Sequence, residues 1–174
     1  MMICISGYTG SGKTTVGAEL AKDLGLKHVN HSYKDYVKQH ADVIKFKRQS
    51  DPKFVKQFDR EIVLEARKSK NCVVTSWLGP WMLREASVKV WLNASLDVRA
   101  KRVCKHVNLS VKETRNYITK KDRLNKLYWK KIYGVDLEDH SNFDIEINTE
   151  NFTTKQVVAI IAAVSIEKDK KKFE

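Results

Sequence analysis

Cysteine is scarce in this sequence, and its placement excludes two common kinds of site. The three cysteines, Cys4, Cys72 and Cys104, are odd in number and far apart along the chain. They offer neither a disulfide framework nor the close pairs of ligands that a zinc site needs. We therefore expect buried or idle thiols in a protein that works in a reducing compartment.

Long apolar runs and low-complexity linkers are absent as well. No stretch approaches the roughly 20 consecutive apolar residues of a membrane span, and a glycine-rich motif begins at Gly7, which leaves no room for a signal peptide. We therefore expect a cytoplasmic protein without a membrane partner. The 174 residues, of which 42% are hydrophobic, predict one α/β domain over residues 1–174 with a buried core.

Acidic residues are outnumbered by basic ones. The sequence has 33 lysines and arginines against 21 aspartates and glutamates, which gives a formal charge of +12 and favours a polyanionic partner. Both nucleotides and RNA meet that description. Much of the excess charge lies in segments that resemble exposed helix, and we interpret the lysine-rich residues 168–172 as a solvated end. Nucleic acid is thus a less favoured partner, and we expect a monomer.

The most informative motif is a complete G-x-x-x-x-G-K-[ST] phosphate loop. It consists of Gly7, Tyr8, Thr9, Gly10, Ser11, Gly12, Lys13 and Thr14, and Thr15 follows it. Glycine lets backbone N–H groups approach a triphosphate closely, and the helix that follows directs its positive dipole end at the anion. Lys13 is expected to bridge the outer phosphates, and the Thr14 hydroxyl suits a Mg²⁺ ligand. The motif predicts a nucleoside triphosphate ligand.

The context of the motif supports this interpretation. Residues 1–6 are an apolar run typical of a buried strand, and residues 14–24 carry apolar positions at helical spacing before Gly25. Further strands are predicted at residues 27–30, 72–75, 88–92 and 143–147. Further helices are predicted at residues 53–68, 96–106, 111–132 and 157–164, and the S-x-x-E sequence at Ser110 marks a helix start. Alternating strands and helices predict a parallel sheet covered on both faces.

The chain resembles archaeal-type cytidylate kinases over nearly its whole length. The resemblance rests on the phosphate loop, on W-M-L-R-E at residues 81–85, on residues 90–102 and on Y-G-V-D at residues 133–136. That family belongs to the nucleoside monophosphate kinases, which are similar to adenylate kinase. The resemblance implies a three-layer α/β P-loop fold with a five-stranded parallel sheet and a core of residues 1–30, 70–106 and 140–166. It also implies a helical acceptor-binding insert at about 31–69 and a short helical lid at about 107–131.

The resemblance also implies an activity and a set of site residues. The protein is expected to transfer the γ-phosphoryl group of ATP to a nucleoside monophosphate, CMP or dCMP, with Mg²⁺ as cofactor. The expected catalytic residues are Lys13, Lys121 and Arg123. Arg123 is expected to supply a lid cation from an adjacent turn, and for Lys121 and Arg123 a solvated helix face is the alternative. Arg99 and Arg102 match an R-x-x-R of the family and are expected to pack on adenine and reach phosphate, with Asn148 and Thr149 at the adenine edge. The expected acceptor-binding residues are Asp59, Arg60, Trp77 and Trp81, for which core packing or a solvated helix face is the alternative.

The chain departs from the family at several charged positions. In the lid, R-E-x-x-E-x-x-R becomes Lys121, Asp122, Asn125 and Tyr128, and after the third strand E-G-R becomes Thr75, Ser76 and Trp77. The G-x-x-F-R segment of the acceptor insert becomes residues 32–36, so Lys34, Lys38 or Arg60 could take over its phosphate contact. These losses leave two alternatives open, which are a degenerate acceptor site that binds RNA or a partner, and a kinase with another small-molecule acceptor.

Overall fold

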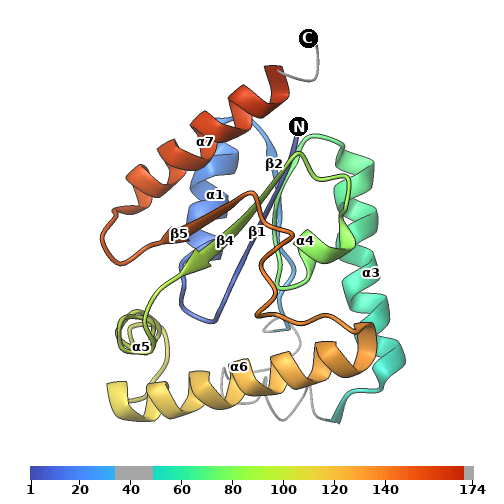
Figure 1. The fold of residues 1–174 in the computed structure, drawn as a ribbon. Helices are drawn as coiled ribbons and strands as arrows, with labels where there is room; N and C mark the ends of the chain where they lie inside the picture. Colours follow the sequence, from blue (N-terminus) through green and yellow to red (C-terminus); the bar gives the residue numbers. More distant parts are fainter. Residues whose placement is uncertain (34–48, 171–174) are drawn as a thin grey trace.

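The computed structural model describes residues 1–33 and 49–170, which form a parallel sheet between layers of helices (Figure 1). In this described part of the chain, five strands pair in the order β2-β3-β1-β4-β5, and all of them run parallel. The strands are β1 (Met2–Gly7), β2 (Lys27–Val29), β3 (Cys72–Thr75), β4 (Val88–Asn93) and β5 (Ile145–Asn148). Their carboxyl ends share one edge of the sheet, which is where open α/β sheets bind ligands.

Helices cover both faces of this sheet. They are α1 (Lys13–Asp23), α3 (Pro52–Ser69), α4 (Gly79–Met82), α5 (Leu96–Cys104), α6 (Val111–Tyr133) and α7 (Thr154–Lys170). Helices α1 and α7 pack side by side on one face, and α3 packs on the other. The long helix α6 runs across the edge where the strands end (Figure 1). The carboxyl edge of the sheet therefore faces α6.

The central strand β1 is buried from both sides. Ile3 and Ile5 belong to a core cluster with α1 and α7, whereas Met2 and Cys4 belong to a second cluster with α3. Successive side chains of a strand point to opposite faces, so a strand that is apolar at every position needs cover on both. All six residues of β1 are buried. The phosphate loop therefore starts from a rigid support.

Local signals set the ends of the helices around the site. The Asp51 side chain accepts a hydrogen bond from a backbone N–H in the first turn of α3, and Pro52 opens that helix. Ser110 and Glu113 form the predicted capping box of α6. Gly134 ends α6 with a φ of 68°, a left-handed conformation that glycine adopts without strain.

The predicted fold class is confirmed, and the bounds of some elements differ. Strand β5 begins at Ile145 rather than at residue 143, because Asp144 pairs with Lys89 just before it. The Asp144 N–H donates to the Lys89 carbonyl (2.9 Å), and the Asp144 carboxylate accepts from the Lys89 N–H (2.8 Å). The helix expected at 96–106 ends at Cys104. The sequence pattern does not predict α4, whose four residues are too few to show a helical period.

The predicted insert and lid can be located on this fold, and their division of the chain remains a prediction. The insert at about 31–69 contains α3, and its residues 34–48, with Lys34 and Lys38, lie outside the described residues. The lid at about 107–131 contains most of α6, which packs along α5. No helix within residues 1–33 and 49–170 is long and apolar enough to cross a membrane.

Candidate active site

The phosphate loop joins β1 to α1 and has a backbone shape that requires glycine. Gly10 and Gly12 have φ angles of 83° and 97°, in the left-handed region that other residues rarely adopt. A Cβ on Gly10 would also lie 2.9 Å from the side chain of Val103. Gly12 precedes α1, and apart from its own chain neighbours no described residue has an atom within 4 Å of where its Cβ would be. The loop therefore leaves open space at the positive end of α1, which suits an anion.

The loop forms one wall of a cavity of about 530 Å³, here called the donor cavity. Its volume is in the range of small-molecule sites. Residues Thr9 to Thr15 of the predicted site line it, and helix α5, helix α6 and the loop before α7 complete the wall. Gly7 and Tyr8 are not among the described lining residues, since the Tyr8 ring packs edge-on against Trp77 and Trp91 behind the loop.

Arg102 is held on the wall of the donor cavity. Its guanidinium donates one hydrogen bond to Thr149 Oγ1 and one to the Thr149 carbonyl, both at 2.8 Å. The Thr149 hydroxyl in turn lies 3.1 Å from the Ser11 carbonyl oxygen and 3.0 Å from the Asn93 carbonyl oxygen. These contacts tie the loop before α7 to the phosphate loop. They also hold the planar cation at the cavity, where it can stack on a base.

Arg99 is buried behind the phosphate loop and is not among the described residues of the donor cavity. Its guanidinium donates to the Thr9 carbonyl (2.9 Å), to the Asp122 carboxylate (2.6 Å) and to the Ala94 carbonyl (3.1 Å). These contacts engage Nε and Nη1 of the guanidinium with groups of the protein. A contact of Arg99 with nucleotide remains a prediction.

A second cavity of about 110 Å³, here called the acceptor cavity, adjoins the first. Four aromatic rings, those of Tyr33, Phe58, Trp77 and Trp129, form part of its wall. The Tyr33 and Phe58 rings stack with their centroids 4.1 Å apart, and the Trp77 and Trp129 rings lie 5.2 Å apart. Flat rings of this kind are the usual surface for a nucleobase. The predicted residue Trp77 thus stands in the cavity wall, and Tyr33, Phe58 and Trp129 are additions that the sequence pattern does not single out.

Asp59, a predicted acceptor-binding residue, lines this cavity from α3. It is 5% exposed, and its carboxylate accepts a hydrogen bond from the Tyr133 hydroxyl (2.9 Å). Burial of the phenol and the neighbouring Asp59 charge raise the pKa of Tyr133 well above its ordinary value, so Tyr133 keeps its proton and donates it. Among the described lining residues of the acceptor cavity, Asp59 is the only carboxylate.

Polar neutral groups meet where β2 and β3 end. The Thr75 hydroxyl donates to the Asn30 side-chain oxygen (2.9 Å) and lies 3.0 Å from His28 Nε2. Thr75 and Asn30 line the acceptor cavity. Asn30 could have been predicted as a site residue, because it directly follows the predicted strand that becomes β2, the neighbour of β3. Ligands of open α/β sheets bind at the carboxyl ends of the strands.

The two cavities share part of their walls. Lys13, Thr14, Trp77 and Lys121 line both of them. The Lys13 ammonium donates to the Tyr8 carbonyl (3.3 Å) and lies 4.9 Å from the Trp77 ring centroid, within cation–π distance. Two predicted catalytic lysines, from α1 and from α6, are thus brought together at the junction of the cavities.

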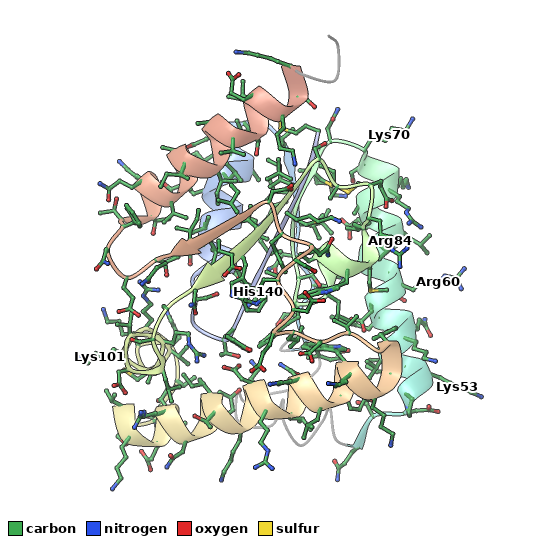
Figure 2. The ribbon with its side chains drawn as sticks, viewed as in Figure 1. Lys53, Arg60, Lys70, Arg84, Lys101 and His140 are labelled. Carbon is green, nitrogen blue, oxygen red and sulfur yellow. The ribbon has the colours of Figure 1, made fainter. Side chains whose placement is uncertain are left out.

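Other predicted residues lie elsewhere. Arg60 is exposed and projects outward from α3 (Figure 2). Trp81 packs its ring edge-on against Trp91 and Phe143 and is not among the described residues of either cavity. Arg123 is exposed on α6 and lines a separate surface hollow. Each residue of an α-helix turns through roughly 100°, so a side chain two positions from the junction faces nearly the opposite way.

The fold and the phosphate loop define a P-loop nucleotide-binding protein, and the comparisons with known proteins specify its family. The chain belongs to the cytidylate kinase-like family, whose model matches residues 30–151. It is 34% identical over 169 residues to the cytidylate kinase of Sulfurisphaera tokodaii, with 94% of each chain covered. It is 36% identical over 170 residues to the cytidylate kinase of Thermococcus kodakarensis, with 94% of this chain and 86% of the relative covered.

Solved structures support the fold. An uncharacterized protein from Eubacterium ventriosum superposes with a TM-score of 0.71 at 18% identity, over 96% of this chain and 98% of the other. The shikimate kinase of Acinetobacter baumannii superposes with a TM-score of 0.61 at 18% identity, over 95% and 93% of the two chains. At such identities the likeness concerns the architecture alone.

Proposed function

We propose that this protein is a nucleoside monophosphate kinase that transfers the γ-phosphoryl group of ATP to CMP or dCMP and releases ADP and the diphosphate. The observation that carries the proposal is the meeting of the donor and acceptor cavities at Lys13 and Lys121. A phosphoryl group that passes directly between two nucleotides needs such a junction lined by cations. The naming of the relatives as cytidylate kinases supports the choice of acceptor.

The donor cavity fits ATP. The open space at Gly12 and the amino end of α1 would receive the phosphates, and Arg102 would stack on the base. The exposed Thr14 hydroxyl lines both cavities and would hold Mg²⁺, which when bound neutralises charge on the outer phosphates. Lys13 would leave the Tyr8 carbonyl for the phosphates, because an anion attracts its ammonium more strongly.

Catalysis would rest on position and charge. Phosphoryl transfer spreads negative charge over the equatorial oxygens of the transferring group and needs no covalent intermediate. The ammonium groups of Lys13 and Lys121, which line both cavities, would stabilise that charge. The Trp77 ring, which lines both cavities, would limit the access of water, the competing acceptor.

Asp59 would select cytosine. The exocyclic amine of cytosine is a hydrogen-bond donor, whereas uracil presents a carbonyl oxygen at the same place. A buried carboxylate accepts from the amine and repels the carbonyl, and it has further lone pairs besides the one that Tyr133 uses. The stacked Tyr33 and Phe58 rings would offer the apolar surface for the base. A bidentate or direct contact of this kind discriminates bases by about 1–3 kcal/mol.

The test is a coupled assay of ADP release with Mg·ATP and a panel of CMP, dCMP, UMP, AMP, GMP and free cytidine. We expect turnover well above ATP hydrolysis with CMP or dCMP, and about 10- to 100-fold less with UMP. Asp59→Asn, which keeps the shape of the side chain, should lower the ratio of the turnover with CMP to the turnover with UMP. Turnover no higher than ATP hydrolysis with every monophosphate would refute the proposal, and turnover with free cytidine alone would assign a different acceptor.

A further inference from the structure

A buried ion pair behind the phosphate loop has no part in the reaction as described so far. It joins Arg99 of α5 to Asp122 of α6, with Arg99 Nη1 2.6 Å from Asp122 Oδ2. The two side chains are only 10% and 11% exposed. A buried pair of this kind gains little net stability, since the loss of hydration offsets much of the attraction. Its contribution is better sought in the geometry that it imposes.

The pair holds the backbone of one phosphate-loop residue, Thr9, at the two peptide groups that flank its Cα. Asp122 Oδ1 accepts a hydrogen bond from the Thr9 N–H (3.3 Å), and Arg99 Nη1 donates to the Thr9 carbonyl (2.9 Å). Arg99 Nε also donates to the Ala94 carbonyl (3.1 Å), directly after β4. Three segments that are distant in the sequence, namely the phosphate loop, the start of α5 and the middle of α6, are therefore joined at one point.

The same point fixes the position of Lys121. Asp122 belongs to the buried stripe of α6, which also contains Ile118, Asn125 and Trp129. Lys121 precedes it by one residue, or roughly 100° around the helix, and lines both cavities. Any slide or rotation of α6 against the phosphate loop would therefore displace the Lys121 ammonium from the junction of the cavities.

We propose that Arg99 and Asp122 are positioning residues, a latch that holds α6 against the phosphate loop so that Lys121 reaches the transferring phosphoryl group. This inference rests on the proposed kinase function. In this role Arg99 contacts Thr9 of the phosphate loop and Asp122, and it is not among the described residues that line the donor cavity. The latch acts on the transition state rather than on the binding of either substrate.

Kinetics of matched variants test the latch. Asp122→Asn keeps the shape of the side chain and removes its charge. Glu138→Gln is the control, because it breaks the more exposed ion pair that Glu138, beyond the end of α6, forms with Lys126 of that helix. We expect Asp122→Asn to lower kcat by at least about 10-fold with KM for Mg·ATP changed by less than about 3-fold, and Glu138→Gln to change neither. An increase in KM for Mg·ATP with kcat retained would overturn the proposal, because it would indicate a role in substrate binding.

A double-mutant cycle separates positioning from general stability. If Asp122 acts through Lys121, Asp122→Asn should cost little further activity in a Lys121→Ala background, whereas a merely structural role predicts additive losses. Hydrogen exchange of the protein without nucleotide gives a second readout. The amides of α6 and of residues 8–13 should exchange faster in Asp122→Asn and in Arg99→Lys than in Glu138→Gln, and equal rates would overturn the latch.

The kinetic assay and hydrogen exchange distinguish a failure of the kinase proposal from a failure of the positioning proposal. A wild-type protein that phosphorylates no acceptor would refute the kinase function, and hydrogen exchange would still decide whether the pair holds α6 to the loop. If Asp122→Asn does not fold, the more conservative Arg99→Lys, which retains a cation, takes its place in the kinetics and in the exchange measurement.

Discussion

Lys121 offers the sharpest test of the junction between the cavities, because it lines both of them. In Lys121→Ala the transferring phosphoryl group would lose one of two flanking cations. Two unit charges 4 Å apart attract by about 4 kcal/mol at the effective dielectric near a protein surface. Lys13 remains and water partly replaces the lost charge, so we expect a loss of about 2–3 kcal/mol in transition-state stabilisation.

That loss corresponds to a kcat about 30- to 150-fold lower, since 1.36 kcal/mol equals a factor of ten. The assay is steady-state ADP release with saturating Mg·ATP and CMP. Lys120→Ala is the matched control, because Lys120 is the neighbouring, exposed lysine of the same helix and lines neither cavity among the described residues. It should keep kcat within about 2-fold.

Lys121→Arg distinguishes charge from shape. It keeps a cation at this position and changes only its shape, so we expect at least a third of the wild-type kcat. The exposed Arg123, two residues away on α6, provides a further comparison. It lines a separate hollow, so its truncation should be nearly neutral. Equal effects of Lys121→Ala and Lys120→Ala, or a larger effect of Arg123→Ala than of Lys121→Ala, would refute the reasoning.

Three further predictions concern the walls of the site and its support. Thr149→Val removes the hydroxyl that Arg102 contacts. The free energy of unfolding in urea should therefore fall by about 1–3 kcal/mol, and KM for Mg·ATP should rise. An unchanged urea midpoint would contradict this prediction. Gly10→Ala forces a Cβ into a left-handed, crowded position, and we expect a melting temperature about 5–10 °C lower and no nucleotide-induced rise in it. The pKa of Glu65 is held below its ordinary 4.5, chiefly by the hydrogen bond from Lys27. The contribution of the Glu65 carboxylate to stability is therefore present above pH 4.5 and is lost as the pH falls through the lowered pKa. The difference in unfolding free energy between wild type and Glu65→Gln should therefore shrink below pH 4.5, and a constant difference would exclude the pairing.

The sequence predicts much of the fold because its local signals agree with the global arrangement. The apolar run before Gly7 is a fully buried strand, and the capping box at Ser110 starts α6 where the pattern places it. The short helix at Gly79 escapes prediction, since four residues carry no periodicity. An element is thus predictable when enough of its residues share one pattern, and a very short element is not.

The candidate site is only partly predictable, because side-chain partners distant in the sequence decide it. Arg99 and Arg102 share one motif, yet Arg99 is engaged by Asp122 and by Thr9, which is 90 residues away. Arg102 instead meets Thr149, 47 residues away, at the cavity wall. Helical spacing likewise shows that Lys121 and Arg123 of α6 face different ways. It does not show which of these two faces of the helix is turned toward the phosphate loop.

The central claim is that ATP and CMP occupy adjoining cavities whose phosphates meet between Lys13 and Lys121. The most direct measurement is calorimetric titration with adenosine and cytidine joined 5′ to 5′ through five phosphates, in the presence of Mg²⁺. The account predicts a dissociation constant at least about 100-fold lower than that of ATP or CMP alone, because one molecule fills both cavities, and a loss of most of this gain in Lys121→Ala. Binding of the bridged compound no tighter than that of ATP would contradict it.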